Sequence, residues 1–123
     1  MSADDINFFI NMREQIKIYH WQTKVYSRHK ATDDVIKELD ENIDKYVEVY
    51  MGKYGRPKLT SRNNTIKLIN MSEVTAVRCV KHCIAYLKKD LVKGLSAQDT
   101  DLVNIRDEML SDLDQLLYLF TLH

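Results

Sequence analysis

Residues 20–57 read HWQTKVYSRHKATDDVIKELDENIDKYVEVYMGKYGRP, and this stretch decides the expected fold. Apolar residues recur in it every three or four positions, which is the period of an amphipathic helix. The pattern ends at two glycines and the only proline of the chain, which are residues that terminate helices. We therefore expect one long helix that begins near residue 28 or 32 and ends at residue 54. Its core face comprises Val35, Ile36, Leu39, Ile43, Tyr46, Val47 and Tyr50.

Composition extends this interpretation to the rest of the chain. The 123 residues are 45% apolar and 29% charged, with three glycines and one proline. That length is sufficient to bury a core without disulfide bonds. The scarcity of Gly and Pro favours helices joined by short connections. We expect residues 1–123 to form a single all-α domain.

Three further helices are expected around the first one. The same periodicity predicts helices over residues 5–26, 72–93 and 97–122. Asp4 or Asp5 could cap the first of these helices. Ser72 and Ser96 are suitable N-cap residues for the other two, and Gly94 is well placed to end the helix that Ser72 begins.

A long connection separates the second expected helix from the third. Residues 52–70 contain two glycines, the proline and an Asn-Asn pair, so they indicate a loop with one short helical turn near residues 65–69. The loop is too long for a tight hairpin, and it can run from one end of a bundle to the other. The predicted fold is a ferritin-like, up-down-down-up four-helix bundle with a long crossover between helices two and three. This crossover is also the most basic part of the chain.

Five side chains in the long segment form a candidate metal site. His29 and Asp33 are four residues apart, as are Asp44 and Glu48, so each pair lies on one face of a helix about 6 Å apart at Cβ. Imidazole nitrogen and carboxylate oxygen are ligands for iron, manganese or zinc. The four side chains project beside the apolar face, where another helix or another subunit can supply further ligands. His20 lies within the apolar arc of the first helix and is expected to be partly buried.

The series from His20 to Glu48 resembles the ferroxidase motif of the Dps family. A tryptophan follows the first histidine, and carboxylates stand four, fifteen and nineteen residues after the second. The resemblance implies a ferritin-like bundle that assembles into a hollow dodecamer, with iron sites between subunits. It implies that one subunit supplies His20, His29 and Asp33, and that its two-fold mate supplies Asp44 and Glu48. The function expected from it is oxidation of Fe(II) by oxygen or peroxide for storage or protection.

The chain also departs from the Dps pattern. The spacing between His20 and His29 is three residues shorter than in that family, and the glycine of the intervening turn is absent. The Lys/Arg-rich tail that binds DNA in some members is also missing. The expectation is therefore an iron site, or a site for another divalent transition metal, in a homo-oligomer that is at least a dimer. The resemblance is strongest to small Dps-like proteins, including ones of large DNA viruses.

Two other functional classes stay open. One is a non-catalytic assembly or DNA-associated protein with a degenerate metal site, in which the acids are solvated. The other is an enzyme that uses the same ligands for different oxygen chemistry. A formal net charge of zero does not favour broad DNA binding.

The remaining signals concern the compartment and a second cluster. Cys79 and Cys83 do not form a disulfide framework, which indicates a reducing, cytoplasmic setting. No apolar run approaches the roughly twenty residues of a membrane span, and the amino terminus does not resemble a signal peptide. His82 between the cysteines could indicate another metal site. We expect it instead to be a surface histidine beside partly buried thiols.

Overall fold

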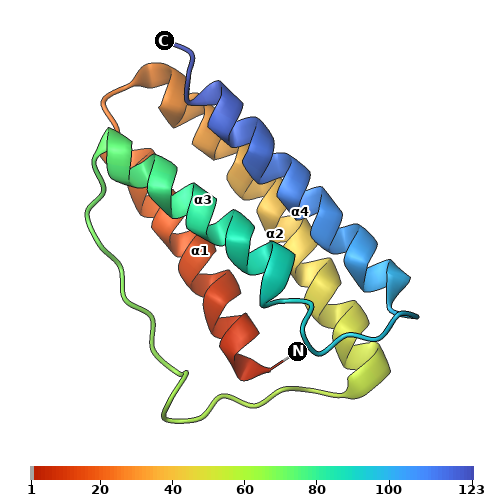
Figure 1. Ribbon diagram of the computed structural model, residues 1–123. Coiled ribbons are helices and arrows are strands. Elements are labelled where there is room, and N and C mark those ends of the chain that lie inside the picture. Colours follow the sequence, from red (N-terminus) through yellow and green to blue (C-terminus); the bar gives the residue numbers. More distant parts are fainter. Residues whose placement is uncertain (1) are drawn as a thin grey trace.

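Four helices pack side by side in the computed structural model, which describes residues 2–123 (Figure 1). They are α1 (Ala3–Gln22), α2 (Tyr26–Tyr54), α3 (Glu73–Lys89) and α4 (Thr100–Leu119). α1 and α2 run in opposite directions, α3 runs in the same direction as α2, and α4 returns. Residues 2–123 contain no strand. The predicted all-α four-helix bundle with a long crossover after the second helix is thus confirmed.

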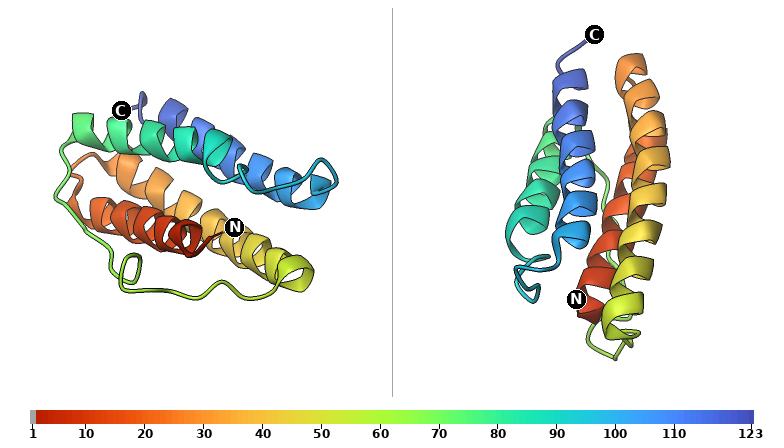
Figure 2. Two further views of the ribbon diagram at one scale, coloured as in Figure 1. Left: turned by 60° about the horizontal axis from the view of Figure 1, so that its bottom comes forward. Right: turned by 90° about the vertical axis from the view of Figure 1, so that its right-hand side faces the viewer.

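The helices form two layers, with α1 and α2 in one and α3 and α4 in the other (Figure 2). α2 packs against both α1 and α4, and α3 packs on α4. Large side chains from every helix fill the space between the layers, and each contributes about 1.5–3 kcal/mol through burial. The most deeply buried are Phe9, Tyr19, Leu39, Tyr46, Leu87, Leu91, Leu102, Met109, Leu113 and Leu116.

Some helix ends differ from the expected ones. They differ where a side chain accepts a hydrogen bond from a nearby backbone amide and thereby forms a turn. α3 begins after Ser72 as predicted, because the Ser72 hydroxyl accepts a hydrogen bond from the Thr75 amide at 3.1 Å. The prediction of Ser96 as the N-cap of the last helix is wrong. Asp99 accepts a hydrogen bond from the Ser96 amide at 2.8 Å, which holds residues 96–99 in a turn outside α4. Asp99 itself occupies the N-cap position of α4.

The first and third helices end earlier than expected. α1 stops at Gln22, because the Thr23 hydroxyl accepts a bond from the Val25 amide and donates to the carboxylate of Glu73 on α3. The chain therefore turns at residues 23–25 and α2 begins at once. α3 ends at Lys89, and residues 90–94, Gly94 included, form turns instead of extending the helix.

The predicted helical turn at residues 65–69 is wrong, because this part of the crossover is extended. Side-chain amides of α1 donate to every second backbone carbonyl of the crossover, and Gln15 also accepts from the Ile69 amide at 3.0 Å. The donors and acceptors are Asn7 with Asn63 and Thr65, Asn11 with Lys67, and Gln15 with Ile69. We call this set the amide ladder.

The amide ladder depends on a match between two repeats. Four residues of α-helix rise about 6 Å, and two residues of extended chain span about 6.6 Å. Amides at positions 7, 11 and 15 can therefore meet carbonyls 65, 67 and 69 in register. This contact holds residues 63–69 of the crossover along the outside of α1 (Figures 1 and 2).

Candidate metal centre

The two histidines of the candidate site meet where α1 ends and α2 begins. His20 lies in the last turn of α1, and His29 lies in the first turn of α2. Their rings stack with centroids 4.0 Å apart and planes inclined by 15°. Only 6% of His20 is exposed, which confirms that it is largely buried. The three-residue link between the helices is short enough to bring the rings together.

Each histidine is held by the backbone of the other. Nδ1 of His20 lies 2.8 Å from the carbonyl oxygen of His29, and Nδ1 of His29 lies 2.9 Å from the carbonyl oxygen of His20. A carbonyl can only accept, so both Nδ1 atoms carry the proton. Thr32 Oγ1, 3.0 Å from His20 Nδ1, further fixes the buried ring. When neutral, each ring keeps an Nε2 lone pair, which is the form of histidine that binds metals.

The carboxylates of the candidate site do not join the histidines within one chain. Asp33 Oδ2 lies 3.7 Å from Nζ of Lys37. Asp44 and Glu48 follow His29 by fifteen and nineteen residues, which is roughly 22–28 Å along α2. Within residues 2–123, no three His, Cys, Asp or Glu side chains are arranged to hold one metal ion. Within a single chain, the two histidines therefore lie together, but Asp33, Asp44 and Glu48 do not combine with them into a metal site.

Asp44 and Glu48 lie on the rim of an apolar pocket that the sequence analysis did not identify. Its volume is about 270 Å³, and its wall consists of side chains from α1 and α2. The sequence signal for this pocket was the pair Ile6 and Ile10, which are four residues apart and so lie on one face of α1. In the structure, Ile10 is 46% exposed. The other lining residues are Phe9, Ile43, Val47 and Met51.

The same flank of the molecule exposes an aromatic side chain at its other end. Trp21 is 65% exposed, and Nζ of Lys17 lies 5.3 Å from its ring centroid. Trp21 follows Ile10 by eleven residues, or about three turns, so both lie on one stripe of α1. This flank thus carries a projecting indole near the histidines and an apolar hollow near the acids.

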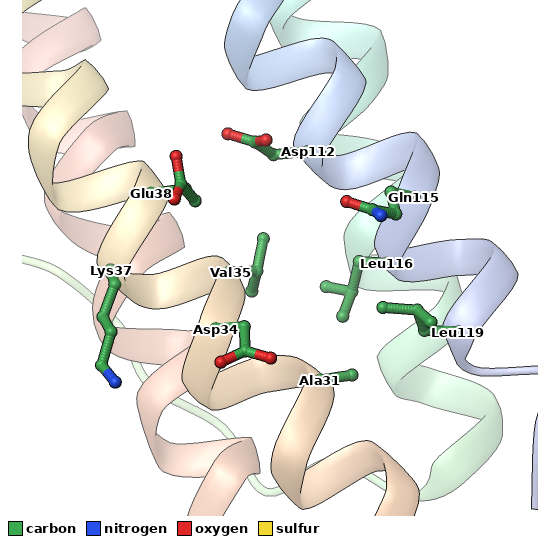
Figure 3. Close-up of a pocket in the computed structure, with 9 residues that line it drawn as sticks. All are labelled: Ala31, Asp34, Val35, Lys37, Glu38, Asp112, Gln115, Leu116 and Leu119. Carbon is green, nitrogen blue, oxygen red and sulfur yellow. The ribbon is translucent and has the colours of Figure 1, made fainter.

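A second groove, between α2 and α4, gathers acids on another side of the bundle (Figure 3). It encloses about 320 Å³ and includes Asp34, Glu38 and Asp112. Glu38 and Asp112 extend over it from the two helices. Burial raises the pKa of Asp112, and the nearby Glu38 and Glu108 carboxylates raise it further. These acids repel one another, and no histidine lines the groove.

Cys79 and Cys83 lie on α3, which contributes no residue to the apolar pocket or to the groove between α2 and α4. Cys79 and Cys83 are free, and Cys83 is buried whereas Cys79 is half-buried. With the exposed His82 they line a cavity of about 400 Å³ between α1, α3 and the crossover. The expectation of a surface histidine beside a partly buried thiol is confirmed for His82 and Cys79, whereas Cys83 is buried more deeply than expected.

None of the four helices within residues 2–123 has the length and apolarity that crossing a bilayer requires.

Comparison with known proteins gives a family and one viral relative. A protein of Enterobacteria phage T4, described as "Uncharacterized 14.6 kDa protein in mobD-ri intergenic region", is 45% identical over 49 residues. The match covers 40% of this chain and 38% of the phage protein, so it spans well under two thirds of that relative. No solved structure matches the chain. Residues 20–120, from the first histidine of the candidate site to the end of α4, match "Family of unknown function (DUF5856)". The chain belongs to this family.

Proposed function

We propose that the protein binds Fe(II) and oxidises it at sites formed between two copies of the chain, as a Dps-like ferroxidase. The observation that carries the proposal is the reciprocal histidine pair. Backbone acceptors hold both Nδ1 protons of His20 and His29, which leaves the Nε2 atom of each stacked ring available as a metal ligand. Such outer hydrogen bonds usually orient metal-binding histidines.

Antiparallel pairing of α2 with its counterpart would complete the site. His29 and Glu48 have the same midpoint along α2 as Asp33 and Asp44, between residues 38 and 39. A two-fold axis at that midpoint would place His29 near the partner's Glu48 and Asp33 near the partner's Asp44. His29 and Asp33 would then lie close to the partner's Asp44 and Glu48 without any change in the structure of α2.

The same axis would also explain the exposed indole. Arg13 of α1 pairs with Asp40 of α2, so the axis passes α1 near residue 15. The Trp21 ring lies on one side of that point, and Ile6 and Ile10 lie at a similar distance on the other side. Each Trp21 would therefore face the partner's apolar pocket of about 270 Å³. Buried tryptophans contribute strongly to interfaces.

The chemistry follows from the donor set. Fe(II) is the substrate, and His20 and His29 would bind it together with the partner's Asp44 and Glu48. Asp33 would be a further ligand or would orient the site. Carboxylates favour Fe(III) over Fe(II), which promotes loss of one electron per iron. The oxidant is oxygen or peroxide, and one peroxide accepts two electrons and two protons to give two waters.

Mixing two inactive variants tests whether the site lies between copies. We expect His29→Ala and Asp44→Ala each to lose anaerobic Fe(II) binding and aerobic oxidation, whereas the exposed Asp114→Ala on α4 keeps both. A mixed dimer of the two variants retains one intact site of two. Statistical mixing should therefore restore about a quarter of the wild-type sites. Wild-type rates in the single variants would contradict the iron proposal, and an inactive mixture would contradict the shared site.

A non-catalytic assembly protein is the second candidate. It is favoured by the Asp33–Lys37 ion pair and by the separation of the acids from the histidines in one chain. In that case sedimentation would still show a dimer that Trp21→Ser weakens, and Fe(II) would not bind. Retention on DNA that falls steeply with salt would indicate a DNA-associated role instead.

A further inference from the structure

The crossover presents an unpaired backbone edge to solvent. Its carbonyls at residues 63, 65, 67 and 69 bond to α1 through the amide ladder. Backbone groups of an extended chain point alternately to opposite sides. The N–H and C=O groups of residues 66 and 68 therefore point away from α1. Both residues are exposed, and their backbone groups make no hydrogen bond within residues 2–123.

Large apolar side chains accompany this edge. Ile66, Leu68 and Ile69 are 37%, 42% and 47% exposed. Ile66 and Leu68 are two residues apart in an extended segment, so their side chains share one face and form an apolar surface of the kind that marks interaction sites. Ile69 lies on the opposite face with Lys67. The hydrogen bonds of the amide ladder use only the backbone of this segment, so these side chains take no part in them.

The charge of the crossover indicates the chemistry of its partner. Residues 55–72 include Arg56, Lys58, Arg62 and Lys67 and no acidic residue, in a chain whose net charge is zero. Arg62 is engaged by Asp4 at 3.0 Å, and the other cations are exposed. A second copy of the edge is disfavoured, because antiparallel pairing centred on Lys67 would oppose two lysines. An acidic partner meets no such repulsion.

We propose that residues 65–70 are a preformed strand edge that binds an extended acidic polypeptide by β-strand addition. Main-chain hydrogen bonds to residues 66 and 68 provide the binding, and the apolar side chains select apolar residues between the acids. Extended segments usually lose conformational entropy when they bind. Here the α1 amides have already ordered the edge, which reduces that loss. The inference is independent of the metal centre.

The test uses a blocked peptide of about eight residues with alternating Val and Glu, which is the length of a typical strand. Binding is measured by fluorescence anisotropy, and contact by slowed hydrogen exchange of the residue 66 and 68 amides. We expect the peptide to bind, and a version N-methylated at alternate residues or with Lys in place of Glu not to bind. Ile66→Pro removes an outward N–H and should weaken binding about tenfold.

Matched variants distinguish the loss of backbone hydrogen bonds at the edge from general effects of a substitution on the crossover. Thr65→Pro removes an N–H that points toward α1, so it should change affinity less than about threefold. Ile66→Ala shows the part due to the side chain alone. Gln15→Ala, on α1, should weaken binding and speed exchange at residues 65–69, because it releases the edge without touching the peptide. Circular dichroism confirms that each variant retains its helices.

Four results would overturn the proposal. The first three are equal binding of the N-methylated peptide, equal losses in Ile66→Pro and Thr65→Pro, and binding of single-stranded DNA as tight as that of the acidic peptide. Self-association abolished by Ile66→Pro would also overturn it, by making a second copy the partner.

Discussion

At the scale of single residues, the core contains one polar atom that lacks a partner. Tyr46 is fully buried, and within residues 2–123 its hydroxyl is the only buried side-chain N or O atom without a hydrogen bond. Burial raises the pKa of Tyr46, and the nearby Asp5 carboxylate raises it further. Its ring packs edge-on against Phe9, with centroids 5.6 Å apart. The ring therefore stabilises the bundle whereas the hydroxyl does not.

Replacing this tyrosine by phenylalanine should increase stability. Tyr46→Phe keeps the ring contact and removes an unsatisfied hydroxyl, so we expect the free energy of unfolding to rise by about 1 kcal/mol. Urea denaturation of both proteins measures the difference. A loss of stability would instead show that a buried water satisfies the hydroxyl.

The two thiols on α3 differ in reactivity for a similar local reason. The Cys83 thiol donates to Cys79 and lowers the pKa of Cys79, while the same contact and burial raise the pKa of Cys83. Alkylation by iodoacetamide should therefore occur at Cys79. Cys83→Ala removes the donor and should move the alkylation profile of Cys79 to higher pH. Cys83→Ser retains a hydroxyl donor and should keep the profile near that of the wild type.

At the scale of elements, carboxylates that repel one another lie in the groove between α2 and α4. Asp112 lies in the groove with Glu38 and Asp34, and Asn42 Nδ2 donates to it at 3.3 Å. The pKa of Asp112 is raised above its ordinary value of 3.8, first by burial and then by Glu38 and Glu108. Folding thus favours the protonated acid, so this residue reduces stability as pH rises from about 3.8 through the folded-state pKa.

Asp112→Asn should consequently stabilise the protein at neutral pH. We expect a higher urea midpoint than wild type at pH 7, and no difference once pH falls below the ordinary pKa of the carboxyl. Asp114→Asn on the same helix serves as the control, because Asp114 is exposed. A neutral-pH midpoint that is lower in Asp112→Asn than in wild type would contradict this account.

At the scale of the whole molecule, one side chain of α2 joins the other three helices at one end of the bundle. Nη1 of Arg28 donates to the hydroxyl of Tyr19 at 2.9 Å and to the carbonyl of Glu73 at 2.8 Å. Nη2 donates to the carbonyl of Phe120 at 3.3 Å, and the guanidinium lies 4.5 Å from that residue's ring centroid. The histidine pair lies beside this junction, so Arg28 supports its geometry.

Arg28→Met should destabilise the fold and loosen this end of the bundle. The change keeps an apolar stem but leaves buried acceptors unpaired, so we expect a loss of about 2–3 kcal/mol in the free energy of unfolding. Arg78→Met, at an exposed position on α3, should change it by less than about 0.5 kcal/mol. Thermal and urea unfolding of the two variants provide the comparison.

The helices were predictable, whereas most of their exact ends were not. Apolar periodicity is a local property of the chain, so α2 was predicted to end at Tyr54, where the structure ends it. Asp99 and Thr23 displaced other ends through bonds that no periodicity reveals. The crossover was mispredicted for the same reason, because amides more than fifty residues away in sequence hold its backbone extended.

The sequence by itself determined four amphipathic helices, a long second connection and the positions of His20, His29, Asp33, Asp44 and Glu48 on them. Only the tertiary structure decided that the two histidines stack and bond to each other's backbone, and that Asp44 and Glu48 lie beside an apolar pocket. It also made the crossover an ordered edge. The physical reason is that helical periodicity is encoded within a few residues, whereas ring stacking, pockets and the amide ladder arise from packing between elements far apart in the chain.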